Sequence, residues 1–88
     1  MIPARYLDYT FGEQRIFYVT EGGVDLSSPP IVNCYFPDND NKSTIDLKRL
    51  DIGVYYFEIC FDRQGTHLFI FFEGVRKTGL LYALVKPY

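Results

Sequence analysis

The fold is decided by the stretch GVYYFEICF at residues 53–61. Tyr55, Phe57, Ile59 and Phe61 alternate there with a second set of side chains that includes Glu58, and this period of two predicts a β-strand. The charge of Glu58 marks the face that meets water, so the ring-bearing set faces a core. After a turn over residues 62–66, residues 67–72 predict a second strand, apolar on both faces apart from His67.

The composition agrees with a β protein. The 88 residues include eight Tyr and eight Phe, no Trp and two Ala, which favours strands over helices. Hydrophobic residues make up 48% and charged residues 23%, as in an ordinary globular protein. A chain of this length holds one core, so we expect a single domain over residues 1–88.

Gly, Pro, Asn and Asp divide the remaining sequence into short apolar segments. The expected strands are 5–11 as an edge strand, 15–20, 31–36 and 80–85. Residues 43–50 are either a strand with a following corner or a short helical turn. The expected turns are 21–23, 37–41 and 73–79, with a rigid connector at 27–30. Strand follows strand without helical segments between them, so the prediction is all-β: an antiparallel immunoglobulin-like (fibronectin III-like) sandwich of about seven strands. A small barrel such as an OB-fold is the competing architecture.

A family resemblance adds to this interpretation. Residues 17–23, FYVTEGG, resemble the F-x-V-T-(D/E)-x-x-G opening of small immunoglobulin-like proteins encoded among tailed-phage and prophage structural genes. Residues 32–38, VNCYFPD, are similar to that group's apolar strand ending in a Pro-Asp turn. Residues 53–55 and 65–67, followed by Glu73-Gly74, resemble its G-x-Y and G-T-(aromatic) hairpin closed by an E-G turn, although His67 stands where an aromatic is usual. The resemblance implies a non-enzymatic virion component of the head–tail or tail accessory type, present in the cytoplasm during assembly and then in the virion.

Several classes are disfavoured by the sequence. The apolar runs are shorter than the ~18–20 residues that span a bilayer, and residues 1–12 lack the pattern of a secretory signal peptide. The formal net charge of −2 argues against a nucleic-acid partner. The first 40 residues are net acidic and the remainder net basic, which predicts either a scattered solvated surface or complementary patches between copies.

No residue pattern predicts catalysis. His67 is the only histidine, and with Asp62 and Glu73 nearby it is a conceivable general base. We expect it instead to be a partly exposed hydrogen-bonding residue. The serines lie in connectors without a nucleophile motif such as G-x-S-x-G, so we expect no enzyme.

Metals and cofactors are not expected either. Cys34 and Cys60 are predicted to be two reduced thiols, because the alternation that buries Phe57 turns Cys60 outward. Two cysteines and one histidine lack zinc-site spacing. Residues 38–41 offer oxygen ligands, but Ser43 stands where an EF-hand loop needs Gly, so a tight turn is expected.

The most informative feature is a surplus of apolar side chains. Val54, Tyr56, Ile70 and Phe72 occupy the phase opposite to the core positions, which predicts an apolar outer stripe on one sheet. It would be a contact with a protein partner or another copy, a stacking platform for sugars or bases, or a surface covered by residues 6–11. We favour the contact and assign it to Tyr56, Ile70 and Phe72. The functional prediction is therefore a structural or assembly protein, with a ligand- or carbohydrate-binding module as the alternative.

Overall fold

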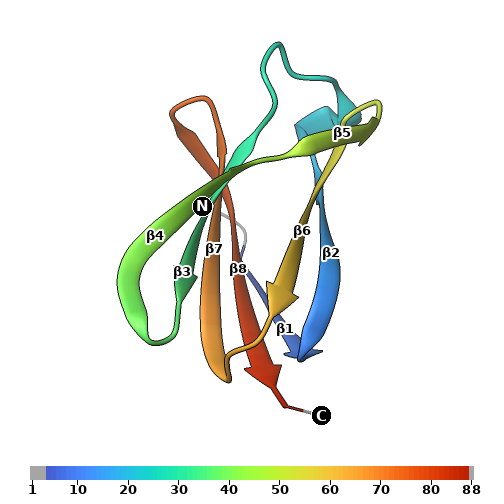
Figure 1. The fold of residues 1–88 in the computed structure, drawn as a ribbon. Coiled ribbons are helices and arrows are strands. Elements are labelled where there is room, and N and C mark those ends of the chain that lie inside the picture. Colours follow the sequence, from blue (N-terminus) through green and yellow to red (C-terminus); the bar gives the residue numbers. More distant parts are fainter. Residues whose placement is uncertain (1–3, 88) are drawn as a thin grey trace.

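The computed structural model describes residues 4–87, and the side chains of 39–41 lie outside what it describes. The chain forms two β-sheets that face each other across one core (Figure 1). The first sheet has five strands in the order β1-β8-β7-β3-β4, and the second has three in the order β2-β6-β5. The prediction of an all-β protein with two facing sheets is therefore confirmed.

The strands follow the predicted segments closely, and there are eight of them in the described part of the chain rather than about seven. Their bounds are β1 Ala4–Thr10, β2 Gly12–Val19, β3 Ile31–Phe36, β4 Asn39–Asp46, β5 Lys48–Asp51, β6 Val54–Phe61, β7 Gly65–Glu73 and β8 Arg76–Lys86. A short 3-10 turn occupies Glu21–Gly23. The turn expected over 73–79 is shorter than predicted, because β8 already begins at Arg76 and pairs with β7 from there.

The segment around residues 43–50 is a strand followed by a corner, which confirms the first of the two expectations for it, and it is not a helical turn. β4 belongs to the five-stranded sheet and β5 to the three-stranded sheet, so the chain changes sheets between them (Figure 1). Leu47 stands at this corner with its side chain buried, and its N–H donates to the carbonyl of Pro30 at 3.0 Å.

Two expectations about strand pairing are wrong. β1 runs parallel to β8, with Ala4 beside Leu80 and Thr10 beside Lys86, so the five-stranded sheet is not purely antiparallel. The hairpin expected over residues 53–72 does not form, because β6 and β7 lie in different sheets. If β6 and β7 were hairpin partners in one sheet, their core-facing rings would lie side by side and could not pack against each other across the core. In facing sheets, Phe57 and Phe69 pack across the core with 5.4 Å between ring centroids.

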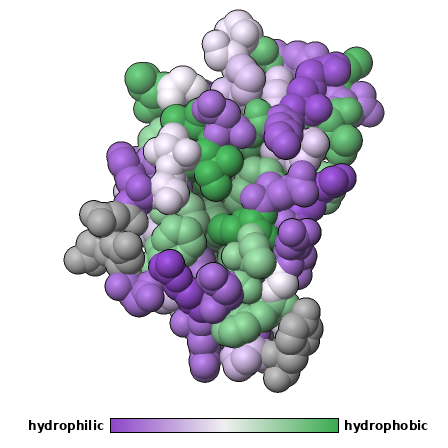
Figure 2. Space-filling model, in the orientation of Figure 1, coloured by the Kyte–Doolittle hydropathy of each residue, from purple (hydrophilic) through white to green (hydrophobic). Residues whose placement is uncertain are grey.

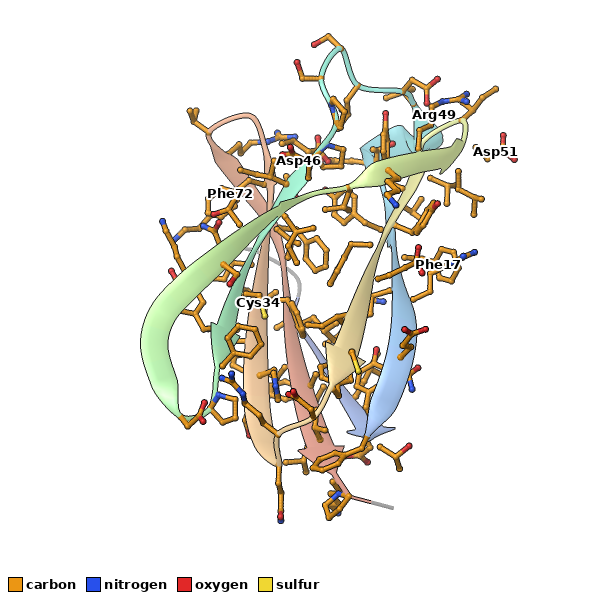
Figure 3. The ribbon with its side chains drawn as sticks, in the orientation of Figure 1. Phe17, Cys34, Asp46, Arg49, Asp51 and Phe72 are labelled. Atoms are coloured by element: carbon orange, nitrogen blue, oxygen red, sulfur yellow. The ribbon has the colours of Figure 1, made fainter. Side chains whose placement is uncertain are left out.

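The core is built mainly from aromatic rings. Phe69 and Phe71 of β7 meet Phe57 of β6, and Phe71 also stacks on Tyr18 of β2 with ring centroids 5.1 Å apart. Cys34 is fully buried between the sheets (Figure 3). Both cysteines are unpaired, and Cys60 is exposed as the strand phase predicted.

The loops at one end of the three-stranded sheet are fixed by Asp25. Its carboxylate accepts hydrogen bonds from the backbone N–H of Gly53 at 2.8 Å and from the guanidinium of Arg49. Both interactions lower the pKa of Asp25, that of Gly53 first. Gly53 has a φ of 70° and lies so close to Gly23 that a Cβ there would overlap the Gly23 backbone.

This close approach predicts a large loss of stability for Gly53→Ala, which adds that overlap to the ~1–2 kcal/mol of left-handed backbone strain. Gly74→Ala is the matched control, because Gly74 has a φ of 65° with no atom within 4 Å of the added Cβ. Urea unfolding of both variants measures the difference. Equal losses for the two variants would contradict the packing described here.

Candidate functional site

The apolar stripe expected on one sheet is in fact divided between the two sheets. Tyr56 lies on the outer face of the three-stranded sheet, and Ile70 and Phe72 lie on the outer face of the five-stranded sheet. Figure 3 shows Phe17, the cross-strand partner of Tyr56, and Phe72 on opposite sides of the molecule. Tyr56 therefore cannot form one continuous surface with Ile70 and Phe72. The error follows from the hairpin that does not exist.

The five-stranded sheet nevertheless carries an apolar surface, which we call the β7 outer face. Its centre is formed by Leu68, Ile70 and Phe72, the alternate positions of β7 whose neighbours His67, Phe69 and Phe71 point into the core. Residues opposite one another on paired strands share a face. The register therefore adds Leu80, Tyr82 and Leu84 from β8, Ile31 and Tyr35 from β3, and Tyr6 from β1. Between Ile31 and Tyr35, Asn33 is a buried polar residue opposite Ile70, and its side-chain oxygen accepts a hydrogen bond from the Thr44 hydroxyl.

The side chains of this face are partly or fully exposed. Tyr6 is 75% exposed although its ring stacks on that of Tyr82, with centroids 4.8 Å apart and planes 7° from parallel. A groove of about 320 Å³ lies beside this ring pair, and Asp8 and Thr66 are polar residues in its lining. Figure 2 shows the sandwich with its two sheets side by side rather than the β7 outer face itself, and apolar residues reach the surface there between hydrophilic clusters.

Residues 6–11 do not cover the β7 outer face, which corrects one of the three interpretations of the stripe. β1 extends the five-stranded sheet at its edge, as expected for a first edge strand, and adds Tyr6 to the face. The sequence analysis missed Tyr6, Tyr82 and Tyr35. The alternate positions of residues 31–35 and 80–84 carry the same apolar signal as those of residues 67–72 and could have pointed to these strands.

The outer face of the three-stranded sheet is mixed in character. Phe17 pairs with Tyr56, and Val19 pairs with Val54. The guanidinium of Arg15 lies 4.7 Å from the centre of the Tyr56 ring, in cation–π geometry. The charged neighbours Arg15 and Glu58 interrupt the apolar surface, so this face is less suited to a dry contact than the β7 outer face.

A polar cluster closes one end of the sandwich between β2 and the β7–β8 turn. The Tyr18 hydroxyl donates to the Glu73 carboxylate and lies 2.5 Å from the Thr78 hydroxyl, and Arg76 lies 3.5 Å from the same carboxylate. Burial first, and then the bond to Glu73, raise the pKa of Tyr18 to about 12. The phenol therefore stays protonated at neutral pH. The cluster links β2 to the β7–β8 turn and supplies neither a base nor a nucleophile.

His67 is a core residue, so the expectation of partial exposure is wrong. Its side chain is 1% exposed and meets the rings of Phe36 and Phe61 edge-on, at centroid distances of 5.6 and 5.0 Å. Burial lowers its pKa, and a backbone hydrogen bond to Gly65 acts in the opposite direction. Among the described residues, Nδ1 has no hydrogen-bond partner. A side chain enclosed in this way cannot reach a substrate as a general base.

The remaining candidates from the sequence are a metal site, the turn at residues 38–41 and the cysteines. Within the part of the chain that the structure describes, no group of three or more His, Cys, Asp or Glu side chains could hold a metal ion. Asp38 lies in the β3–β4 turn and pairs with Arg63 at 3.0 Å, while the side chains of 39–41 are outside the described part. Burial raises the pKa of the Cys34 thiol to about 12, which makes it unreactive.

The lowered pKa of His67 predicts a pH-dependent stability. The unfolded chain binds a proton at this histidine near pH 6.5, whereas the folded chain binds it only at lower pH. The free energy of unfolding should therefore fall as the pH drops below about 6.5, by at most ~1.4 kcal/mol per pH unit, until the folded pKa is reached. Urea unfolding at pH 7.5, 6.5 and 5.5 measures this, and His67→Phe should flatten the dependence. Parallel pH profiles for the two proteins would contradict the burial of His67.

Comparison of the chain with known proteins finds no relative. Searches of protein-family models, curated proteins and solved structures find no match to the chain. Among the described residues, no helix is long and apolar enough to cross a membrane.

Proposed function

We propose that the chain is a non-enzymatic structural or assembly protein that binds another protein surface through the β7 outer face. The observation that carries this proposal is the apolar surface that extends across β1, β8 and β7 and includes Ile31 and Tyr35 of β3. Soluble monomers rarely expose contiguous apolar patches beyond a few hundred Å², and such patches often mark contact sites. Ile70 and Phe72 lie at its centre and are the proposed anchors. Tyr56 belongs to the other sheet and is left out of this surface.

We also infer an immunoglobulin-like fold from the strand order. The second, sixth and fifth strands form one sheet, and the eighth, seventh, third and fourth strands are neighbours in the other. Variable-type immunoglobulin domains have this arrangement, in which the strand after the third joins the third strand's sheet. The strand order supports this class more strongly than a closed barrel, because the described strands form two separate sheets.

The resemblance to phage and prophage structural proteins gives the proposal its biological setting. The Gly-, Pro- and Asp-bearing parts of the motifs fall at turns of this chain: residues 21–23 form the 3-10 turn, Pro37-Asp38 lies between β3 and β4, and Glu73-Gly74 lies at the β7–β8 turn. In this setting the chain is made in the cytoplasm and becomes part of a particle. Its partner is a protein, with neither nucleic acid nor a membrane involved.

The carbohydrate-binding alternative draws support from the Tyr6–Tyr82 ring pair and the groove beside it. Sugar recognition combines such a platform with several polar groups that bind hydroxyls. Here the lining is mainly apolar, with Leu7, Leu84 and the two rings outweighing Asp8 and Thr66. A protein contact uses the whole surface and is the better account.

The proposal predicts that the chain is a component of purified particles. In the strain that encodes it, deletion of its coding sequence should leave particles defective, and the wild-type sequence should restore them. Phe72→Asp should fail to restore them, because a charge in the centre of a dry contact is left without a partner. Mass spectrometry of purified particles and counts of intact particles by electron microscopy are the measurements.

Phe17→Asp is the matched control, since it places the same charge on the exposed outer face of the other sheet. It should restore particles like the wild type. Thermal unfolding shows whether the variants fold, and Ile70→Lys replaces Phe72→Asp if the latter does not. The proposed function would be refuted if the chain is absent from wild-type particles and the particles remain normal after the deletion.

A further inference from the structure

We infer that the free edge of β2, together with the groove beside it, is a second binding site, which takes an extended segment of a partner protein by β-strand addition. The segment carries an apolar side chain that enters the groove and a carboxylate that pairs with Arg5. β2 belongs to the sheet opposite the β7 outer face, so this site goes beyond the proposed function and does not depend on it.

β2 lies at an open edge of its sheet. The sheet has the order β2-β6-β5, and among the described strands only β6 lies alongside β2 (Figure 1). In the corresponding sheet of immunoglobulin domains, the first strand lies on the free side of the second. Here β1 pairs with β8 of the five-stranded sheet instead. Within the part of the chain that the structure describes, the place beside β2 is therefore open to another strand.

The backbone of β2 offers hydrogen bonds along this edge. Thr20, which follows β2, donates its N–H to the carbonyl of Gly53 at 2.9 Å, so its backbone faces β6. Successive residues of a strand direct their backbone groups to opposite sides, and the even-numbered residues of β2 therefore also face β6. The N–H and C=O groups of residues 13, 15, 17 and 19 point to the open side. An extended peptide backbone matches this row, because it repeats donors and acceptors at the same spacing.

The second half of this edge lacks the features that keep edge strands from pairing. Natural edge strands are commonly short or carry charges. β5 is four residues long with the sequence KRLD, and β1 and β4 carry exposed charged residues. β2 has charges at Glu13 and Arg15, but its last four residues are IFYV, and Phe17 and Val19 are 46% and 62% exposed. Pairing is thus directed to the last residues of β2.

A groove of about 330 Å³ opens beside these residues. Its lining consists of residues 17–19, Phe71, Gly79, Leu80 and Arg5. On an added strand, the residue opposite Tyr18 shares the inward face of Tyr18 and points between the sheets, where the groove lies. Gly79 contributes no side chain to the lining, and Phe71 is a core ring. The groove therefore suits an apolar side chain from the added strand.

Arg5 determines the charge of the occupant. It pairs with Leu81, whose side chain is fully buried, so the Arg5 side chain lies on the inner face of the sheet and lines the groove. None of the ion pairs of the described residues involves Arg5. The nearby Glu73 carboxylate accepts a hydrogen bond from Tyr18 and is already paired with Arg76. Inward positions of a strand are two residues apart, so the matching segment has an apolar residue and an Asp or Glu separated by one residue.

Such a contact is weak and reversible. It combines one buried apolar side chain, one exposed ion pair and a few backbone hydrogen bonds, and it must offset the cost of ordering the segment. We expect a dissociation constant on the order of 0.1 mM. The segment is therefore lost on purification, and Phe17 stays accessible in purified particles.

A capped peptide, acetyl-TVTLTDT-amide, tests the site by amide hydrogen exchange of the isotope-labelled full chain. In the free chain, the amides of Phe17 and Val19 should exchange rapidly, and those of Ile16 and Tyr18, which face β6, should exchange slowly. Peptide at about ten times its dissociation constant should slow the exchange of Phe17 and Val19 about tenfold, because about a tenth of the chains remain free. Exchange at Ile16 and Tyr18 should not change.

Two variants separate the contributions of the groove and of the charge. Gly79→Val fills the groove, and its Cβ would lie 3.8 Å from Phe71 in ordinary contact, so the variant should fold and bind the peptide about tenfold more weakly or worse. Arg5→Glu should weaken binding about fivefold, and acetyl-TVTLTKT-amide should bind this variant better than it binds the wild type. Lys48→Glu is the matched control. It makes the same charge change on β5, at the opposite edge of the sheet, and should leave binding unchanged.

Slow exchange of Phe17 and Val19 in the free chain would mean that residues 1–3 or a second copy already cover the edge, and it would overturn the inference. Exchange that is unaffected by the peptide at a few millimolar would do the same. Equal binding by Gly79→Val and the wild type would overturn the groove, and equal binding by Arg5→Glu would overturn the carboxylate. These outcomes leave the β7 outer face untouched, since the particle experiment tests that face separately.

Discussion

The structure depends on β7 being apolar on both faces while standing at the centre of its sheet. Its inward side chains, Phe69 and Phe71, pack against Phe57 and Tyr18 of the opposite sheet and hold the two layers together. Its outward side chains have no second layer above them within the described part of the chain. A core only one layer thick can bury one face of each strand. The aromatic and aliphatic residues left on the second face are what turn a small sandwich into a surface suited to contact.

The local structure could be predicted from the sequence to a large extent. The inward phase of residues 55, 57 and 61, the outward position of Cys60 and the bounds of β3 all follow from alternation and turn residues. These features are decided by short-range patterns, in which each side chain has only two faces to choose from. The corner at Leu47 was one of two expectations, since a single buried residue between polar neighbours fits a helical turn equally well.

The pairing of strands could not be predicted in the same way. A short linker after Phe61 is compatible with a hairpin and with a crossing to the other sheet, and the choice is made by rings that are distant in sequence. The parallel pairing of β1 with β8 brings together strands from opposite ends of the sequence, for which no local signal exists. Because the site was deduced from an assumed hairpin, it combined Tyr56 with Ile70 and Phe72, although they face opposite directions. Only the register between β1 and β8 shows that Tyr6 and Tyr82 lie side by side on the β7 outer face.

The central claim is that the β7 outer face is the contact surface of the chain. Hydroxyl-radical footprinting of the side chains, compared between the free protein and purified particles, tests it residue by residue. The account predicts that the side chains of Leu68, Ile70 and Phe72 are protected in the particles, while those of Phe17 and Tyr56 are not. Protection confined to the three-stranded sheet, or no protection at all, would contradict it.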